Sequence, residues 1–370
     1  MKKIIVLIIL FIVFIYSARY FNPKLKDTPI QLNVIQPKTT NIQAPPVAIV
    51  AQDLDTPWSI AFIPDGRMLA TERKGTVRLD GQPISDIKGV LEIGEGGLLG
   101  LTLHPDFANN HYVYVYYTYT QNGDNTFNRV SRMSYENNTL SNEVVLIDAI
   151  PGASNHNGGR IKFGPASTRG EPDNLLYITT GDAQEPSQSQ NINSLAGKIL
   201  RVNDDGTVAF GNPFNNLVYS YGHRNPQGLA WDSQGNLWAT EHGQSGLDEI
   251  NLIESGNNYG WPDIEGNKTA PDMVTPVVNS GNTTWAPADA VFVGSSLFFT
   301  GLRGTTLYEA VIENRQVVEI KEHFNGQFGR LREIVLGPDN LLYVTTSNKD
   351  GRGMPKEGDD KIIRINPSLL

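Results

Sequence analysis

The feature that most constrains this chain is a recurring unit in which a turn of the Pro-Asp-Gly type precedes a short apolar strand. Six copies lie between residues 46 and 370, which gives about 54 residues a unit, close to the ~40–50 residues of a propeller blade. The sequence therefore predicts an all-β fold, a six-bladed β-propeller of four-stranded antiparallel blades. The copies are "IPDGRMLATER" (Ile63–Arg73), Asn110–Thr120, "EPDNLLYITTGD" (Glu171–Asp182), "DSQGNLWATEHG" (Asp232–Gly243), Val291–Gly304 and "GPDNLLYVTTS" (Gly337–Ser347).

An open pair of β-sheets would also contain many short strands, but a regular long repeat favours a radial array. The 36 Gly and 22 Pro residues agree with many turns between short strands. We expect Val47–Leu54 to supply the strand that closes the ring against the last blade.

The N-terminus predicts export. "MKK" precedes the apolar run Ile4–Tyr16, which has the length of a signal peptide and is shorter than the roughly 20 residues of a membrane span. No clean cleavage site follows, so residues 1–18 form either a cleaved signal peptide or a membrane anchor. Residues 19–46 are predicted to form a flexible linker, and residues 47–370 are predicted to form the propeller domain. The expected location is the bacterial periplasm, with the protein soluble or N-terminally anchored.

The charge balance argues against nucleic acid as a partner. The net charge is −9 and no long basic run follows residue 30, whereas phosphate binding needs a concentrated basic face. The chain has no Cys, which excludes disulfides, thiolate nucleophiles and Cys-zinc sites. A local cationic cluster in such a chain would indicate an anionic small-molecule ligand.

Three of the repeated units carry arginines next to predicted strands. Arg330 and Arg332 lie two residues apart in "GRLREIVLG" and project to the same side of a strand. Arg224 precedes Asn225 in "YGHRNPQG", and Arg303 lies in "GLRGTT". These are either solvated side chains near acidic neighbours or, if the loops meet at a channel mouth, a socket for a ligand with several carboxylates.

One histidine stands out because of its neighbours. His156 lies in "NHNGGRIKFG", where the glycines permit close approach of the backbone to a ligand. A neutral imidazole is the usual general base near pH 7, although a loop histidine is often only a polar surface group. His223 and His242, which also lie in candidate mouth loops, are the alternative bases.

The segment Thr240–Pro262 combines Gly-rich backbone with Asp248 and Glu249. Carbonyls and carboxylates in such a loop suit a hard cation such as calcium. The spacing is not that of an EF-hand, and a turn followed by an acidic strand start is the alternative.

Several ordered segments between Leu54 and Arg364 resemble the glucose/sorbosone dehydrogenase family of soluble quinoprotein glucose and aldose sugar dehydrogenases. The resemblance implies a propeller that binds pyrroloquinoline quinone (PQQ) and Ca²⁺ at its mouth. It also implies oxidation of the anomeric hydroxyl of aldose sugars to lactones, with electrons passed to an external quinone or redox protein. The matching pieces are "GEGGLLGLTLHPDF", "NHNGGRIKFGP", "GKILRVNDDGTV", "YGHRNPQGLAWD", "EHGQSGLDEINLI" and "NNYGWP".

The resemblance also implies roles for individual residues. The His of the "H-x-x-G-R" motif, here His156, is the catalytic base, and Arg224 touches both the cofactor and the transferred charge. Calcium ligands fall on the loop of Gly243 and Gln244, through backbone carbonyls, and on Glu249 and Tyr259 for a second ion. Cofactor contacts fall on Glu95, Arg224, Asn225, His242, Arg303, Arg330 and Arg332.

The chain departs from the family pattern at three positions. Glu95 stands where the family often has Gln, Asn155 replaces the Asp of the glucose-specific members, and Gln244 replaces a Pro. The loops between strands are short, which favours the broad-specificity aldose branch. The competing hypotheses are a calcium-dependent lactonase-type propeller hydrolase and a non-catalytic binding propeller. A monomer and a homodimer are both compatible with the sequence.

Overall fold

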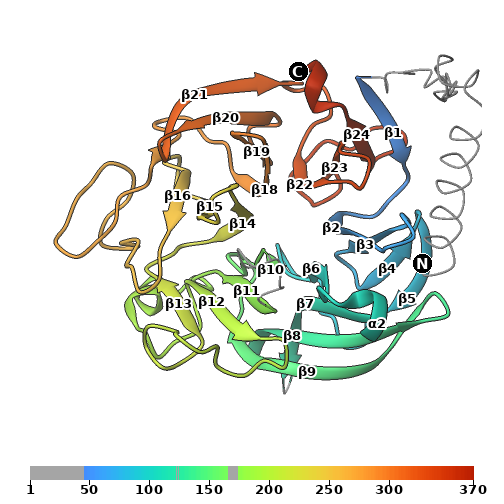
Figure 1. The fold of residues 1–370 in the computed structure, drawn as a ribbon, viewed down its shortest axis with the longest axis horizontal. Coiled ribbons are helices and arrows are strands. Elements are labelled where there is room, and N and C mark those ends of the chain that lie inside the picture. The colour runs from blue at the N-terminus through green and yellow to red at the C-terminus, as the bar shows by residue number, and fades with distance from the viewer. Residues whose placement is uncertain (1–45, 122, 124, 166–173) are drawn as a thin grey trace, which may run out of the picture. The chain divides into compact units, whose positions relative to one another are not determined.

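Six β-sheets are arranged in a ring around a central channel, as the sequence predicts (Figure 1). The computed structural model describes residues 46–121, 123, 125–165 and 174–370. The predicted leader and nearly all of the predicted linker lie outside these residues. No helix within the described ranges is long and apolar enough to cross a membrane.

Every sheet contains four antiparallel strands, and we number these blades 1 to 6. Blade 1 contains β2 (Pro57–Phe62), β3 (Met68–Glu72), β4 (Thr76–Leu79) and β5 (Gln82–Asp86). Blade 2 contains β6 (Leu98–Leu103), β7 (Tyr112–Gln121), β8 (Asn125–Glu136) and β9 (Thr139–Pro151). Blade 3 contains β10 (Ile161–Phe163), β11 (Leu175–Thr180), β12 (Lys198–Asn203) and β13 (Val218–Tyr221). Blade 4 contains β14 (Pro226–Trp231), β15 (Leu237–Glu241), β16 (Glu249–Ile253) and β17 (Val278–Asn279). Blade 5 contains β18 (Pro287–Val293), β19 (Ser296–Gly301), β20 (Leu307–Glu313) and β21 (Gln316–His323). Blade 6 contains β22 (Leu331–Leu336), β23 (Leu342–Thr346), β24 (Ile362–Ile365) and β1 (Val47–Ala51).

The repeated unit of the sequence forms the first hairpin of each blade. In blades 1, 4, 5 and 6 its turn follows the innermost strand. In all six blades its apolar segment becomes the second strand, namely β3, β7, β11, β15, β19 or β23. These second strands are buried along most of their length; β3 and β15, for example, are buried throughout. Burial on both faces explains why these segments read as continuous apolar runs.

The ring is closed by strand β1, which pairs antiparallel with β24 from Val47 opposite Ile365 to Ala51 opposite Ile362. Blade 6 therefore takes three strands from the end of the chain and one from residues 47–51. This confirms the expected closing strand. Closure leaves the ring without a free edge between its first and last blades.

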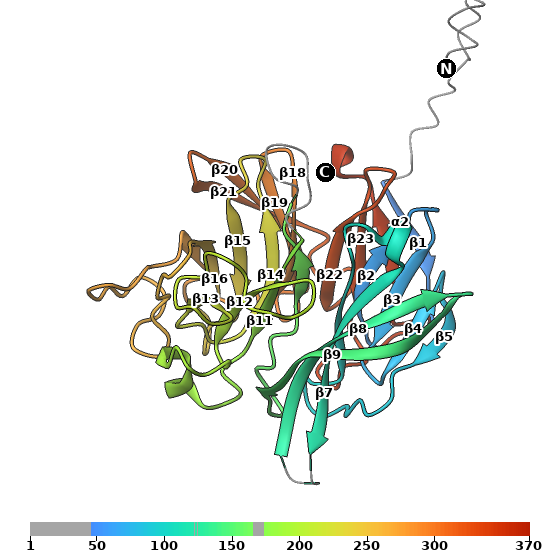
Figure 2. The same ribbon diagram turned by 60° about the horizontal axis from the view of Figure 1, so that its bottom comes forward.

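The structure contains little helix. Helix α2 (Phe107–Asn110) precedes β7, and the short 3-10 helices η2 (Pro186–Gln190) and η3 (Pro367–Leu369) lie before β12 and at the C-terminus. Strands β7, β8 and β9 are 10, 12 and 13 residues long and extend beyond their neighbours (Figure 2).

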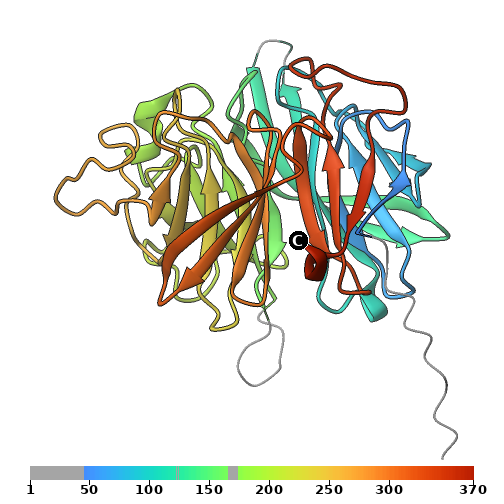
Figure 3. The same cartoon turned by 90° about the horizontal axis from the view of Figure 1, so that it is seen from above.

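The innermost strands β2, β6, β10, β14, β18 and β22 line the channel, and the strands run between its two ends (Figure 3). Part of the channel is filled by a buried ion network. Arg160 pairs with Glu333 and lies 3.2 Å from Asp289, which also accepts from Lys162 at 2.9 Å. Arg160 also stacks over Trp58 at 4.3 Å. Two cations therefore face two carboxylates within the ring.

Candidate active site

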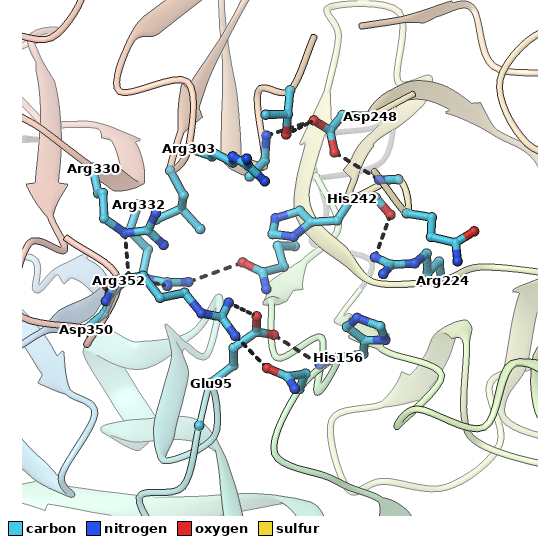
Figure 4. A pocket seen from close by; sticks show the side chains of 18 of the residues that line it. Glu95, His156, Arg224, His242, Asp248, Arg303, Arg330, Arg332, Asp350 and Arg352 are labelled. Atoms are coloured by element: carbon cyan, nitrogen blue, oxygen red, sulfur yellow. Dashed lines mark hydrogen bonds and ion pairs between the residues drawn. The ribbon is translucent and has the colours of Figure 1, made fainter. Parts of the chain in front are cut away.

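A cavity of about 370 Å³ lies at one end of the channel, which we call the mouth (Figure 4). Two kinds of loop build its wall: those that precede the innermost strands and those that join the second and third strands of a blade. Six arginines line it against three carboxylates. The arginines are Arg73, Arg224, Arg303, Arg330, Arg332 and Arg352, and the acids are Glu95, Asp248 and Asp350.

His156 lies in the loop before β10, and its side chain is 20% exposed at the cavity wall. Its Nδ1 lies 2.7 Å from Oδ1 of Asp182, whose Oδ2 accepts from Nε1 of Trp261 at 2.9 Å. A carboxylate accepts hydrogen bonds, so this contact places the imidazole proton on Nδ1 and leaves Nε2 as the basic nitrogen. The geometry of a histidine oriented by a buried acid therefore suits general-base chemistry.

The glycines after His156 serve packing against the neighbouring strands. A Cβ added to Gly158 would lie 2.5 Å from the carbonyl oxygen of Thr179, and one added to Gly159 would lie 2.7 Å from the Leu99 side chain. The side chain of Asn225 also fixes this loop, because its Oδ1 accepts from the Gly158 N–H at 3.0 Å. From the sequence, we expect these glycines to let the backbone approach a ligand. The structure instead shows that larger residues would clash with the neighbouring strands.

Arg330 and Arg332 meet in the cavity, as their spacing predicts. Arg330 donates through Nε to Asp350 at 2.8 Å. Arg332 is buried and donates to Oγ of Ser347 and to Oε1 of Gln227, both at 3.2 Å. Burial lowers the pKa of Arg332 to about 10, although the negative charge of Asp350 acts to raise it. The guanidinium of Arg332 therefore remains charged at neutral pH.

Arg224 and Arg303 come from blades 4 and 5 and keep donors that no protein group satisfies. Nη1 of Arg224 donates to the carbonyl of His242 at 3.3 Å, but its buried Nε has no partner among the described residues. Arg303 is exposed and makes no hydrogen bond or ion pair with the described part of the chain. Unsatisfied guanidinium donors at a cavity wall suit an anionic ligand.

Glu95 and His242 lie near each other at the mouth, and each influences the pKa of the other. Burial opposes ionisation of Glu95, yet the charge of His242, the hydrogen bond from the His156 N–H and Arg352 together lower the pKa of Glu95 to about 2. Burial lowers the pKa of His242, and its buried Nε2 lacks a partner among the described residues. His242 therefore offers one more polar atom to a ligand in the cavity.

The predicted calcium ligands lie in two adjoining places. Gly243 and Gln244 line the main cavity, whereas Glu249 and Tyr259 line a small neighbouring cavity that Gly243 also touches. The carboxylate of Asp248 accepts from the backbone N–H groups of Gly243, Trp285 and Ala286 at 2.7–2.9 Å. Asp248 thus shapes the loops and has its oxygens occupied.

The acid Glu249 lies close to Glu241. Burial, and then the charge of Glu241, raises the pKa of Glu249. Among the residues that the structure describes, no cluster of three or more His, Cys, Asp or Glu side chains is spaced to hold a metal ion. A calcium ion here would therefore depend on backbone carbonyls for much of its coordination.

The family is decided by comparison with known proteins. The family model described as "Glucose / Sorbosone dehydrogenase" matches residues 54–363. The chain belongs to this family. The Aldose sugar dehydrogenase YliI of Escherichia coli is 30% identical over 85% of this chain and 92% of its own length. Quinoprotein glucose dehydrogenase B of Acinetobacter calcoaceticus is 34% identical over 60% of this chain and 53% of its own.

A solved structure of the same family has the same architecture. The PQQ-bound form of the aldose sugar dehydrogenase from Streptomyces coelicolor superposes with a TM-score of 0.80 at 38% identity. The superposition covers 86% of this chain and 97% of the other.

Sequence reasoning missed several cavity residues, among them Arg73, Gln227, Asp350 and Arg352, and also the acid that orients His156. Arg352 lies between two glycines, a signal like that of the predicted Arg303, and could have been found by the same rule. Arg73 and Gln227 line the cavity but carry no distinctive local pattern. Asp182 follows the second strand of blade 3 at the end of a repeated unit, and only the fold brings it to His156.

The alternative base His223 is ruled out by its position. It is fully buried, with Nε2 2.8 Å from Ser220 Oγ and Nδ1 2.8 Å from Glu241. Its ring stacks on Tyr259 at 4.8 Å. His223 therefore supports the loop that carries Arg224 and does not reach the cavity.

Proposed function

We propose that the protein is a PQQ- and calcium-dependent dehydrogenase that oxidises the anomeric hydroxyl of aldose sugars to lactones. The observation that carries this proposal is the gathering of six guanidinium groups around a cavity whose wall also presents the His156–Asp182 pair. Three more cations than carboxylates line the cavity, which suits a polycarboxylate cofactor inside an acidic protein. Family membership and the named activity of the E. coli relative support the same reaction.

The residues at the mouth fit PQQ. The cavity is within the size range of small-molecule sites. The unpaired Nε of Arg224 and the exposed guanidinium of Arg303 suit the carboxylates and quinone oxygens of PQQ, and Nε2 of His242 is also unpaired among the described residues. Arg330 and Arg332 complete the cationic wall. The side chain of Asn225 accepts a hydrogen bond from the Gly158 N–H and so supports the loop that carries His156. In our proposal Asn225 therefore acts on the cofactor through that loop.

Calcium is assigned to the two places described above. The backbone carbonyls of Gly243 and Gln244 are proposed for an ion at the cofactor, and Glu249 with the Tyr259 carbonyl for a second ion. The small cavity that Glu249 and Tyr259 line supports the second position, because the carboxylates of Glu241 and Glu265 also line it.

The chemistry divides between cofactor and protein. PQQ supplies, when bound, an electrophilic quinone that accepts a hydride, that is, two electrons and a proton, from the sugar. His156 takes the proton of the C1 hydroxyl on Nε2, and Asp182 stabilises the imidazolium that results. The Arg224 guanidinium, on the same cavity wall, favours negative charge that develops there.

Substrate range, acceptor and location are further parts of the proposal. Asn155 in place of an Asp, with short loops, favours a broad range of aldoses. Electrons pass to an external acceptor, a quinone or a redox protein. The leader predicted in residues 1–18 supports an exported enzyme in the periplasm, either soluble or N-terminally anchored.

The test is reconstitution of the purified apoprotein with PQQ and Ca²⁺, followed by glucose and an artificial electron acceptor. Acceptor reduction with lactone formation is the expected result. His156→Ala should lower kcat by about 10² to 10⁴ with PQQ binding retained. Hydrolysis of a lactone without quinone would instead indicate a lactonase, and a protein that does neither would be a binding propeller.

A further inference from the structure

Arg352 bridges three blades across the mouth (Figure 4). It lies in the loop after β23, where its Nη1 pairs with Glu95 and its Nη2 donates to Oδ1 of Asn155 at 2.6 Å. Glu95 precedes β6 and Asn155 precedes β10. One planar guanidinium thus connects two loops that are 257 and 197 residues away in the sequence.

The same bridge reaches the backbone of His156. Oε2 of Glu95 accepts from the His156 N–H at 3.0 Å, and the Glu95 N–H donates to the Ser154 carbonyl at 2.7 Å. His156 has a positive φ of 60°, a left-handed conformation that is unfavourable for a side chain other than Gly and needs support from its surroundings. Glu95 provides that support directly, and Arg352 holds Glu95.

Arg352 is itself held in position. Its backbone N–H donates to Oδ1 of Asp350 at 2.9 Å, and the other oxygen of Asp350 binds Arg330 at 2.8 Å. The Arg352 side chain is 52% exposed, whereas that of Glu95 is 16% exposed. The acid therefore lies inside the cavity wall, and the cation closes it from the solvent side.

A carboxylate in this wall is unfavourable for the proposed function. Glu95 is ionised at neutral pH, and like charges repel strongly where little water screens them. Glu95 is also the position at which this chain departs from the neutral Gln of the family pattern. A cation beside Glu95 would offset this repulsion.

We propose that Arg352 is a positioning residue that cancels the charge of Glu95 and so keeps the Ser154–His156 segment docked beneath an anionic cofactor. The proposal rests on the function proposed above. It makes the two residues a unit: the loss of Arg352 is harmful only while residue 95 is acidic.

A double-mutant cycle tests the unit. The variants are Arg352→Ala, Glu95→Gln and both together, and the dissociation constant of PQQ is measured by quenching of tryptophan fluorescence in apoprotein with Ca²⁺. We expect Arg352→Ala to weaken binding about 10-fold to 100-fold, because the buried carboxylate loses its partner. Glu95→Gln should bind at least as well as the wild type. The double variant should return to within about threefold of Glu95→Gln.

A second readout needs no cofactor. Amide hydrogen exchange of the peptide that covers residues 154–157 should be about tenfold faster in Arg352→Ala apoprotein than in the wild type. The matched control is Arg67→Ala, which removes a similarly exposed arginine that pairs with Asp65 outside the cavity. The Arg67→Ala control should leave both readouts unchanged and should lower the melting temperature by no more than about 3 °C, since exposed ion pairs stabilise little.

The outcomes separate this proposal from the proposed function. A double variant that binds PQQ as weakly as Arg352→Ala, or unchanged exchange at residues 154–157, would overturn the pairing. If the wild type itself does not bind PQQ, the proposed function fails, and the exchange measurement alone then decides the role of Arg352.

Discussion

At the scale of single residues, several charged side chains at the mouth are each held by another residue. Asp182 orients His156, Asp350 holds Arg330, and Arg352 holds Glu95. Such supporting contacts restrict the side chains to one arrangement before any ligand binds. Preorganised charges stabilise a transition state better than mobile ones because they need no rearrangement during the reaction.

Asp182→Asn tests the orientation of the base. An amide can donate to Nδ1 of His156 and so place the proton on Nε2, the nitrogen that must accept one. We expect kcat to fall by about 10² to 10⁴, with little change in PQQ affinity. Steady-state kinetics of the reconstituted enzyme measure this effect.

The double variant His156→Ala/Asp182→Asn is the control. It should be no slower than His156→Ala alone, because both substitutions disable one base. Normal turnover in Asp182→Asn would show that the acid does not set the tautomer.

The low pKa of Glu95 predicts a pH dependence of stability. The pKa is about 2 in the folded protein against an ordinary value of 4.5, so ionised Glu95 stabilises the fold fully above pH 4.5 and progressively less as the pH falls towards 2. The free energy of unfolding of the wild type relative to that of Glu95→Gln should therefore fall by about 2 kcal/mol between pH 6 and pH 3. Urea titrations of both apoproteins at pH 6 and pH 3 measure the gap, and a gap independent of pH would contradict the assignment.

At the scale of elements, a buried lysine ties the loop before β12 to the propeller. Nζ of Lys198 donates to the carbonyls of Gln188, Ser189 and Ala196 at 2.6–2.9 Å. Ser189 in turn donates through Oγ to the carbonyl of His223 at 2.7 Å, next to Arg224. The loop around η2 therefore supports the arginine that faces the cavity.

Lys198→Met removes the ammonium group and leaves the carbonyls of Gln188, Ser189 and Ala196 without this hydrogen-bond donor. We expect a loss of about 2–4 kcal/mol in the free energy of unfolding, measured by urea denaturation. Lys88→Met, at an exposed position, should change stability by less than about 0.5 kcal/mol. Equal stability of the Lys198 variant and the wild type would mean that water replaces the ammonium group.

The repeated elements could be predicted from the sequence because turn residues and apolar runs are local signals. The second strand of each blade follows directly from its turn, as in β3 and β23. The two-residue strand β17 could not be predicted, since it exists only through its pairing with β16. Its residues carry no apolar alternation of their own.

At the scale of the whole molecule, ring closure converts distant segments into neighbours. Arg224, Arg303 and Arg332 were predicted to converge because equivalent loops of a propeller meet at one end, and the structure brings them to one cavity. Asp182 escaped prediction because its importance lies in its partner, His156. Long-range pairing of this kind leaves no pattern in the nearby sequence.

The central claim is that this ring of arginines binds one polycarboxylate cofactor above His156, and titration of the apoprotein with PQQ in the presence of Ca²⁺ tests it most directly. With PQQ at 100 times its dissociation constant, the account predicts a stabilisation of about 2.7 kcal/mol, seen as a rise of several degrees in melting temperature that saturates at one PQQ per chain. A melting temperature that does not respond to PQQ at any concentration would contradict it.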